Sequence, residues 1–261
     1  MRGIEINWNP IAHLGPIPIN WYGITVAVGF IVGWLLVRRW APRYDVPREK
    51  IDGLLIWIIV GTVIGARLYF VVQNEPADYV RQPWRIAAIW EGGLAYFGGL
   101  FGAILAAFIY TKREELSFAH VADLFAPAIP IGSAIGRISC GLAGMDYGTP
   151  TRLPWGVVYT NPNSYAPIDG TPRHPDQIYE LLGDLVIAAV LIKLRTRLKG
   201  GNLFLVYLIL FSVLRFLVFF VRGSVPPVAL GLKNAQWTAL AILLAAIPFL
   251  IAQVTRSRKR S

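Results

Sequence analysis

Long apolar stretches separated by short polar segments dominate this chain. A membrane-spanning helix needs about 20 predominantly apolar residues, because each residue adds about 1.5 Å of rise across the hydrocarbon core. Seven stretches meet this requirement: residues 17–37, 51–72, 93–110, 118–142, 177–194, 203–221 and 237–254. The pattern therefore predicts an all-α fold, a polytopic membrane bundle of about seven transmembrane helices.

The positive charges lie mainly on one side of the predicted bundle. If consecutive stretches cross in alternate directions, fifteen Lys and Arg residues collect on one side, seven collect on the other, and three fall inside spans. Cytoplasmic loops of membrane proteins are enriched in these residues. We therefore expect the N-terminus outside and the C-terminus in the cytoplasm. The first stretch precedes Arg38 and Arg39 and lacks a small-residue cleavage site, so we expect an uncleaved anchor.

The composition agrees with a membrane protein and excludes several other classes. Hydrophobic residues make up 55% of the chain and charged residues only 15%. The formal net charge of +10 follows largely from the sidedness of Lys and Arg, so anionic lipid rather than nucleic acid is the expected partner. A single cysteine, Cys140, excludes an intrachain disulfide, and the three histidines are scattered. We predict no metal and no cofactor.

Two long connections, residues 73–92 and 143–176, fall on the predicted outer side. Long loops held by a rigid scaffold often carry function. We therefore expect the working face to open outward, in the periplasm or outside the cell. Without a linker or a convincing internal repeat, we expect one integral-membrane domain over residues 1–261.

Charged residues inside the apolar stretches indicate a polar interior, because each must be paired, hydrated or close to an interface. They are Asp52, Arg67, Asp123, Arg137, Glu180, Asp184 and Arg215. For the aspartates, structural ion pairs are the simpler interpretation. Arg137 and Arg215 lie toward the outer halves of their spans, and each can offer a two-pronged guanidinium to a phosphate. The alternative is that each arginine pairs with a buried carboxylate such as Glu180 or Asp146.

Three further segments carry candidate chemistry, each with a structural alternative. Tyr22 could donate its phenol to a substrate oxygen, or it could belong with Trp21 to the interfacial aromatic belt. Gly98 and Gly99 could admit a ligand close to the backbone, or they could serve helix packing. His174 precedes a helix-starting Pro-Asp pair and could transfer protons, or it could be solvated in its loop. A Gly-x-Ser-x-Gly motif is absent, so covalent catalysis is not supported.

Taken in order, the motifs resemble the bacterial phosphatidylglycerol–prolipoprotein diacylglyceryl transferase family over nearly the whole chain. The most specific are the stretch from Gly136-Arg137 to Asp146-Tyr147-Gly148 and the run from Arg173-His174-Pro175 to Tyr179-Glu180. The resemblance implies an enzyme of the bacterial inner membrane. Such an enzyme moves a diacylglyceryl group from phosphatidylglycerol to the lipobox cysteine in the signal peptide of a prolipoprotein. A thioether forms and glycerol phosphate leaves.

The resemblance also implies which residues form the site. Arg137 and Arg215 match motif arginines and would act in catalysis, together with Tyr22. Substrate-binding roles are implied for Arg137 and for further motif positions, namely Asp146, Gly148, Gly98, Gly99 and Arg222. Asp146 stands where a glutamate is usual.

Three departures from the family pattern keep a second interpretation open. Phe97 stands where many members have His or Tyr, Cys140 replaces a usual asparagine, and Phe219 replaces a usual glutamate. A phenyl ring cannot transfer a proton, which makes His174 the candidate substitute base. Loss of the carboxylate at Phe219 is expected to leave Arg215 without a nearby partner. The alternative function is a noncatalytic phospholipid-binding or lipid-transport relative. An ion-coupled transporter ranks last, because paired interrupted spans and repeat symmetry are not evident.

Overall fold

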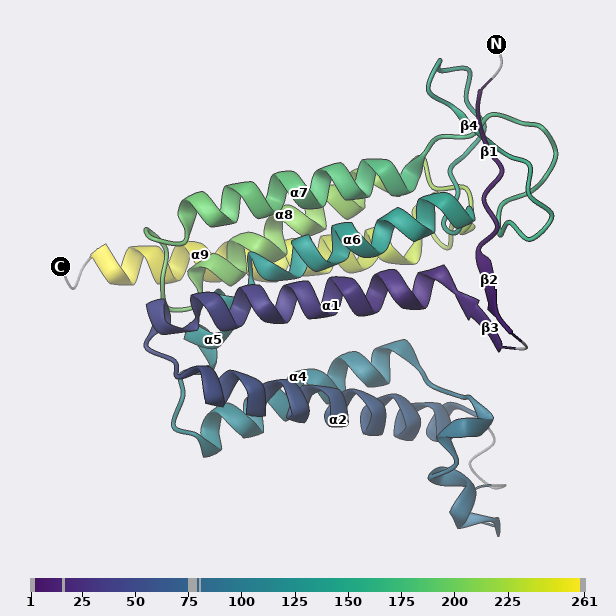
Figure 1. The fold of residues 1–261 in the computed structure, drawn as a ribbon. Helices are drawn as coiled ribbons and strands as arrows, with labels where there is room; N and C mark the ends of the chain where they lie inside the picture. Colours follow the sequence, from purple (N-terminus) through teal and green to yellow (C-terminus); the bar gives the residue numbers. More distant parts are fainter. Residues whose placement is uncertain (1–2, 16, 75–78, 80, 259–261) are drawn as a thin grey trace. The chain divides into compact units, whose positions relative to one another are not determined.

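The structure is a computed structural model of the 261-residue chain, and it describes residues 3–15, 17–74, 79 and 81–258 (Figure 1). Among the described residues, four helical stretches are long and apolar enough to cross a membrane, namely Trp21–Tyr44, Arg48–Gln73, Phe118–Ala143 and Asn234–Gln253. The prediction of a helical membrane protein is confirmed at this level. The number of spans and their orientation stay predictions. Residues 75–78 and 80 of the predicted 73–92 loop, and the basic Lys259 and Arg260, lie outside the described residues.

Helices follow one another along most of the chain. They are α1 (Trp21–Trp40), α2 (Arg48–Gln73), α4 (Tyr96–Arg113), α5 (Phe118–Phe125), α6 (Ala128–Ala143), α7 (Asp176–Leu194), α8 (Asn202–Val218) and α9 (Asn234–Arg258). Short 3₁₀ helices are η1 (Ala41–Tyr44), η2 (Pro83–Ile86) and η3 (Ile89–Glu91). Their positions match the predicted apolar stretches to within a few residues at most ends.

The fourth predicted stretch differs, because it contains two helices rather than one. α5 ends at Phe125 and α6 begins at Ala128. Pro127 lies in the break and precedes the first residue of α6. Proline has no backbone N–H to donate and its ring collides with the preceding turn, so it interrupts a continuous helix. Hydropathy alone does not register this break, since Pro127 stands among apolar residues.

Short strands also occur, which the apolar pattern did not predict. β1 (Ile4–Ile6) pairs in parallel with β4 (Val157–Tyr159), and β2 (Ile11–Leu14) pairs antiparallel with β3 (Ile17–Asn20). β3 takes up the first residues of the predicted first span, so α1 begins only at Trp21. The β1–β4 pair joins segments about 150 residues apart and therefore depends on tertiary contacts.

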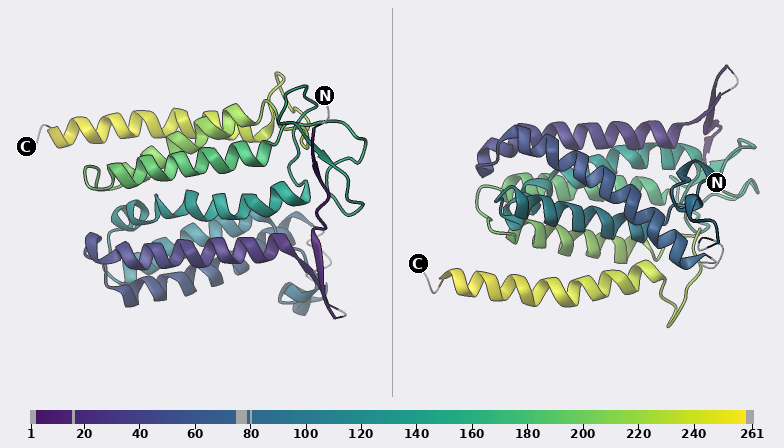
Figure 2. Two further views of the ribbon diagram at one scale, coloured as in Figure 1. Left: turned by 45° about the horizontal axis from the view of Figure 1, so that its top comes forward. Right: turned by 90° about the horizontal axis from the view of Figure 1, so that it is seen from below.

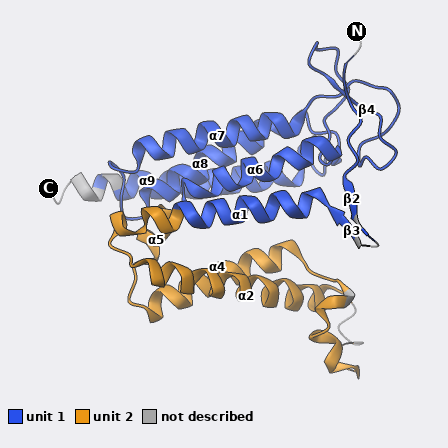
Figure 3. Cartoon of the chain, in the orientation of Figure 1, with its two compact units in different colours: residues 1–36, 125–261 blue, residues 37–124 orange. Residues whose placement is uncertain are grey.

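The chain forms two compact units, residues 1–36 with 125–261 and residues 37–124 (Figure 3). In the first unit, α6 packs on α7, α7 on α8, and α8 on α9 (Figures 1 and 2). α1 approaches α6 in the same unit, where the Thr25 and Ser139 hydroxyls lie 2.5 Å apart. In the second unit, α2 packs against α4. A single domain over residues 1–261 stays a prediction.

Arg67 ties the segment between α2 and α4 to the end of α2. Its guanidinium donates to the carbonyl oxygens of Arg85 at 2.5 Å, Ile86 at 2.9 Å and Gly92 at 2.6 Å. The side chain is buried. Carbonyl dipoles therefore stabilise the charge of this buried arginine, and its contacts in the second unit are structural.

Candidate functional site

A tight turn after α6 places the first acidic group of the site. α6 ends at Gly144, whose φ of 74° is left-handed, and the Gly144 N–H donates to the Cys140 carbonyl oxygen. Asp146 follows with φ 58°. Glycine takes this conformation without steric cost, and aspartate tolerates it better than most residues. The turn brings Asp146 back toward Arg137, nine residues earlier on α6.

Glu180 is the centre of the site. Its Oε2 lies 2.8 Å from an Arg137 nitrogen and 2.9 Å from an Arg222 nitrogen, and its Oε1 accepts a hydrogen bond from Arg215. The Glu180 side chain is only 2% exposed. One buried carboxylate thus contacts three guanidinium groups from α6, from α8 and from the segment after α8.

Asp146 forms a second bridge on the more open side. Its Oδ2 accepts from Arg137 at 2.9 Å, and its Oδ1 lies 3.0 Å from Arg222. The Asp146 side chain is 37% exposed, in contrast to Glu180. We call the six charged residues the arginine cluster: Arg137, Arg215, Arg222, Asp146, Asp176 and Glu180.

Arg222 is the most buried arginine of the cluster. Its Nε donates to Asp176 Oδ2 at 2.5 Å, and its side chain is 3% exposed. The Lys233 ammonium donates to the carbonyl oxygens of Arg222 and Phe219, with 2.7 Å to the latter. Segment 221–223 pairs with 147–149 through Thr149 N–H to the Val221 carbonyl at 2.7 Å. Arg222 therefore has three carboxylate partners, Asp146, Asp176 and Glu180, and its implied contact with substrate stays a prediction.

Phe219 lies beneath two of the guanidinium groups. The Arg222 and Arg215 guanidinium carbons are 4.4 Å and 4.7 Å from the centre of its ring. The expectation that Arg215 lacks a nearby partner is wrong, because Glu180 reaches it from α7. The aromatic face adds an attraction for cations at the place of the usual carboxylate.

The two arginines predicted to bind phosphate lie on the accessible side of the cluster. The Arg137 and Arg215 side chains are 17% and 25% exposed. The alternative foreseen from the sequence, pairing with Glu180 and Asp146, is what the structure contains. Asp146 is the carboxylate that water reaches best, so its link to Arg137 costs least to open. An anion that displaces Asp146 would meet Arg137 with its fork already oriented by Glu180.

His174 is held by hydrogen bonds in the loop before α7 and is partly buried. Its backbone N–H donates to the Thr149 carbonyl at 3.0 Å, and its Nδ1 lies 3.3 Å from the Tyr179 hydroxyl. That hydroxyl accepts a hydrogen bond from Trp155 Nε1 at 2.8 Å. Partial burial lowers the pKa of His174 below its usual 6.5. The imidazole is therefore neutral at pH 7 and able to accept a proton.

Gly148 has a packing reason to be glycine. A Cβ atom at this position would collide with the backbone and Cβ of His174, and Gly148 itself forms an isolated antiparallel bridge with Arg222. The close approach of these segments places the His174 loop next to the segment that carries Arg222. Substrate binding by Gly148 stays a prediction.

The remaining predicted site residues lie on other elements. Tyr22 is exposed in the first turn of α1, the helix that contacts α6 through Thr25 and Ser139. Gly98 and Gly99 lie in the second unit, buried where α4 meets α2. This packing agrees with the structural alternative, and substrate binding by Gly98 and Gly99 stays a prediction. Phe97 precedes them and is exposed, with its ring edge-on to that of Tyr96 at 5.6 Å.

Sequence reasoning missed two members of the arrangement. The sequence pattern indicated Asp176 only as a helix-starting residue, and Lys233 only as one of the seven basic residues on the predicted outer side. A usable signal existed for Asp176, since Asp176, Glu180 and Asp184 recur every four residues and thus share one face of α7. Nothing local marks Lys233, whose partners are backbone carbonyls.

Comparison with known proteins agrees with the motifs. A family model described as prolipoprotein diacylglyceryl transferase matches residues 10–252. The chain is similar to proteins named phosphatidylglycerol–prolipoprotein diacylglyceryl transferase. The one from Bordetella bronchiseptica is 33% identical over 246 residues, covering 91% of this chain and 92% of the relative. The one from Nitratidesulfovibrio vulgaris is 36% identical over 241 residues, covering 90% and 88%. A Nostoc relative is 34% identical, with 87% and 88% covered.

Proposed function

We propose, since the chain belongs to the prolipoprotein diacylglyceryl transferase family, that it transfers the diacylglyceryl group of phosphatidylglycerol to the sulfur of a lipobox cysteine. This is the first step of bacterial lipoprotein maturation, and it releases glycerol phosphate. The observation that carries the proposal is the arginine cluster, in which Arg137 and Arg215 share Glu180 on a partly exposed face. The substrate partners are phosphatidylglycerol and the signal peptide of a prolipoprotein.

The cluster suits the charge change of this reaction. The cysteine sulfur attacks the glycerol carbon that carries the phosphate ester, so a C–S bond forms while the C–O bond to phosphate breaks. The bonding electrons go to the phosphate oxygen, and the phosphodiester monoanion becomes a phosphomonoester that carries more negative charge. Arg137 and Arg215 would stabilise that developing charge more strongly than the bound substrate, which is the requirement for catalysis.

His174 is our proposed acceptor of the thiol proton. Phe97 cannot serve, whereas the neutral His174 imidazole has a hydrogen-bonded partner in Tyr179 that orients its ring. Its loop packs on Gly148, which bridges to Arg222. Tyr22 would donate its phenol to a lipid oxygen from α1. Asp146 would act as the carboxylate that yields Arg137 to the incoming phosphate.

The enzyme would lie in the bacterial inner membrane with about seven spans. α4, α7 and α8 would cross in addition to the four longest apolar stretches, with the N-terminus outside and the C-terminus in the cytoplasm. In this orientation the turn at Asp146 and the His174 loop face outward. This orientation rests on the sidedness of the basic residues.

A reconstituted assay tests the proposal. Purified protein receives phosphatidylglycerol with a labelled glycerol headgroup and a lipobox peptide, and peptide mass and headgroup release are followed together. We expect both to rise in equal amounts. Arg137→Gln and Arg215→Gln should each lower kcat/KM by about 100-fold or more, as for loss of a donor to a developing oxyanion. Arg38→Gln, which removes a cation from an exposed pair with Asp52, is the matched control.

Two results would contradict the proposal. Binding of phosphatidylglycerol without headgroup release, under conditions where a relative from the same family is active, would favour the noncatalytic lipid-binding alternative. Full activity in both arginine variants would contradict the proposed site but not the proposed reaction.

A further inference from the structure

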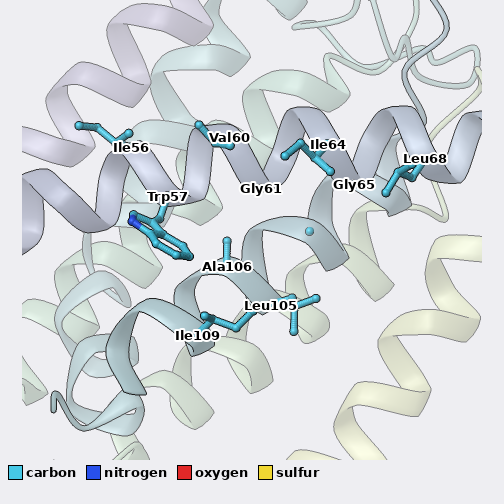
Figure 4. A pocket seen from close by; sticks show the side chains of 11 residues that line it. Ile56, Trp57, Val60, Gly61, Ile64, Gly65, Leu68, Leu105, Ala106 and Ile109 are labelled. Atoms are coloured by element: carbon cyan, nitrogen blue, oxygen red, sulfur yellow. The ribbon is translucent and has the colours of Figure 1, made fainter. Parts of the chain in front are cut away.

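An apolar groove runs along the second unit. All of its lining residues precede the arginine cluster in the sequence. It has a volume of about 400 Å³ and is formed entirely by residues of α2 and α4 (Figure 4). One wall consists of Ile56, Val60, Ile64 and Leu68, which recur every four residues along α2. Leu105 and Ile109 of α4 form the other wall. The groove thus follows the helix axes rather than crossing them.

Glycines make the floor of this groove. Gly61, Gly65 and Gly102 line it, and they let the α2 and α4 backbones approach so closely that a Cβ on Gly61 would meet the Gly102 carbonyl oxygen at 2.7 Å. The large side chains on either side therefore project beyond the glycines and leave a hollow between them. The hollow is therefore a consequence of close helix packing, and it is fixed by the backbone.

The dimensions and the chemistry of the groove match one lipid acyl chain. From Ile56 to Leu68 the rise of α2 gives a length of about 18 Å. One leaflet of a bilayer contributes about 15 Å of hydrocarbon, half of the usual 30 Å. The wall residues are exposed, and those of α2 lie in a helix that is long and apolar enough to cross a membrane. Polar side chains do not line the groove, so a headgroup has no place inside it.

Basic residues lie one helical turn beyond one end of the groove. Lys112 and Arg113 follow Ile109 by three and four residues, so they continue the same side of α4 toward its C-terminus. Both side chains are exposed. An acyl chain lying along Leu105 and Ile109 would put its phosphate at the level of these two cations. Of the two glutamates that follow, Glu114 pairs with Lys50 at 3.4 Å, so the two exposed cations remain complementary to an anionic headgroup.

We propose that the α2–α4 groove is a binding site for an anionic phospholipid, with one acyl chain in the groove and the phosphate at Lys112 and Arg113. The bound lipid would cover the apolar walls of the second unit and stabilise the packing of α2 on α4. In the proposed orientation it belongs to the cytoplasmic leaflet, so it is distinct from a substrate lipid that reacts on the outer side. The site itself does not depend on the transferase activity.

Fluorescence quenching tests this site directly, because Trp57 lines the groove. The protein is reconstituted with phosphatidylglycerol or phosphatidylcholine brominated on the acyl chains, which quench tryptophan on contact. Subtracting the signal of Trp57→Phe isolates Trp57 from the other eight of the nine tryptophans. We expect Trp57 to be quenched at a lower mole fraction of brominated phosphatidylglycerol than of brominated phosphatidylcholine.

Matched variants separate the two halves of the site. Arg113→Gln should lower the preference for phosphatidylglycerol about fivefold, as expected for loss of one cation near the headgroups. Arg43→Gln removes an exposed arginine of η1 that is not adjacent to the groove and should leave the preference unchanged. Val60→Phe should fill the groove and reduce quenching by both lipids, whereas Ile59→Phe, on the same helix outside the lining, should not.

Equal quenching by the two lipids would show that only bulk lipid covers the walls and would overturn the proposal. An unchanged preference for phosphatidylglycerol in both Arg113→Gln and Lys112→Gln would overturn the proposed headgroup site. Since quenching is read without a peptide substrate, failure of this site and failure of the transferase proposal are separate results.

Discussion

At the scale of single residues, buried charge is compensated within the arginine cluster. Three arginines face three carboxylates, and Glu180 alone contacts all three guanidinium groups. Removing a buried group from such an arrangement leaves its partners unpaired at low dielectric, which costs more than the pair contributes. The cluster is thus both a candidate phosphate site and part of what holds α6, α7 and the end of α8 together.

Glu180→Gln tests this dual role. The change keeps the shape of the side chain and removes the charge shared by Arg137, Arg215 and Arg222. We expect the free energy of unfolding to fall by about 3–5 kcal/mol, the range for breaking a buried ion pair. Activity should fall as well. Unfolding by SDS titration measures the first effect, and the headgroup-release assay measures the second.

Glu114→Gln is the matched control for Glu180→Gln. Glu114 pairs with Lys50 at 3.4 Å and is 32% exposed. Exposed ion pairs contribute at most about 1 kcal/mol. If the two variants unfold alike, Glu180 does not have the central role that its contacts indicate.

His174 gives a prediction about pH. Burial lowers its pKa below the usual 6.5, and a general base works only in its deprotonated form. The rate should therefore be constant above about pH 6.5 with respect to this group and should fall as the pH drops through the lowered pKa. His174→Gln should slow the reaction and remove this acidic limb from the profile of kcat/KM.

His120→Gln, at an exposed position of α5, should leave both the rate and the acidic limb unchanged. An acidic limb that persists in His174→Gln would assign the proton acceptor to another group. The Tyr179 hydroxyl, which orients His174, is then the next residue to vary.

At the scale of elements, small residues decide how closely the helices of the second unit pack. A Cβ atom on Gly98 would collide with the Gly65 carbonyl oxygen and with Tyr69 Cβ. The sequence left open whether Gly98 and Gly99 serve a ligand or packing. The contacts give the packing explanation directly, and the same crossing forms the floor of the α2–α4 groove.

Gly98→Ala should destabilise the second unit by roughly 1–3 kcal/mol, because backbone atoms cannot move aside as a flexible side chain can. Gly33→Ala is the matched control in another membrane helix, where the added carbon would meet only the Ala128 carbonyl oxygen at 3.8 Å. SDS titration followed by circular dichroism compares the two. A stable but inactive Gly98→Ala protein would instead support the predicted substrate contact.

At the scale of the whole molecule, the orientation of the spans decides which lipid leaflet supplies each site. The count of Lys and Arg predicts the C-terminus and the connection after α7 in the cytoplasm. A fluorescent-protein fusion at the C-terminus should therefore fluoresce. Alkaline phosphatase should be active when fused after Asn163 and inactive when fused after Lys199. The opposite activities would show that the orientation is inverted and that the arginine cluster opens toward the cytoplasm.

Much of the architecture could be predicted from the sequence, since hydropathy is a property of consecutive residues. The apolar stretches became helices, the motif order indicated the family, and comparison with known proteins confirms that family. Arg137, Asp146, Arg215 and Arg222 were singled out together, and the structure brings them together. The break at Pro127 and the short strands were missed, because proline within an apolar run and pairing between distant segments leave no mark on hydropathy.

The sequence by itself therefore determined the helices, the family and the residue types of the candidate site, and it predicted the sidedness of charge. Tertiary structure alone decided which charges meet. Glu180 joins Arg215 across 35 residues and Asp176 joins Arg222 across 46, and Phe219 lies under the arginine that had been expected to lack a partner. The physical reason is the distance along the chain over which each property is decided. A span depends on the transfer free energy of about 20 neighbouring residues, whereas an ion pair depends on where separate helices place their side chains, which only packing fixes.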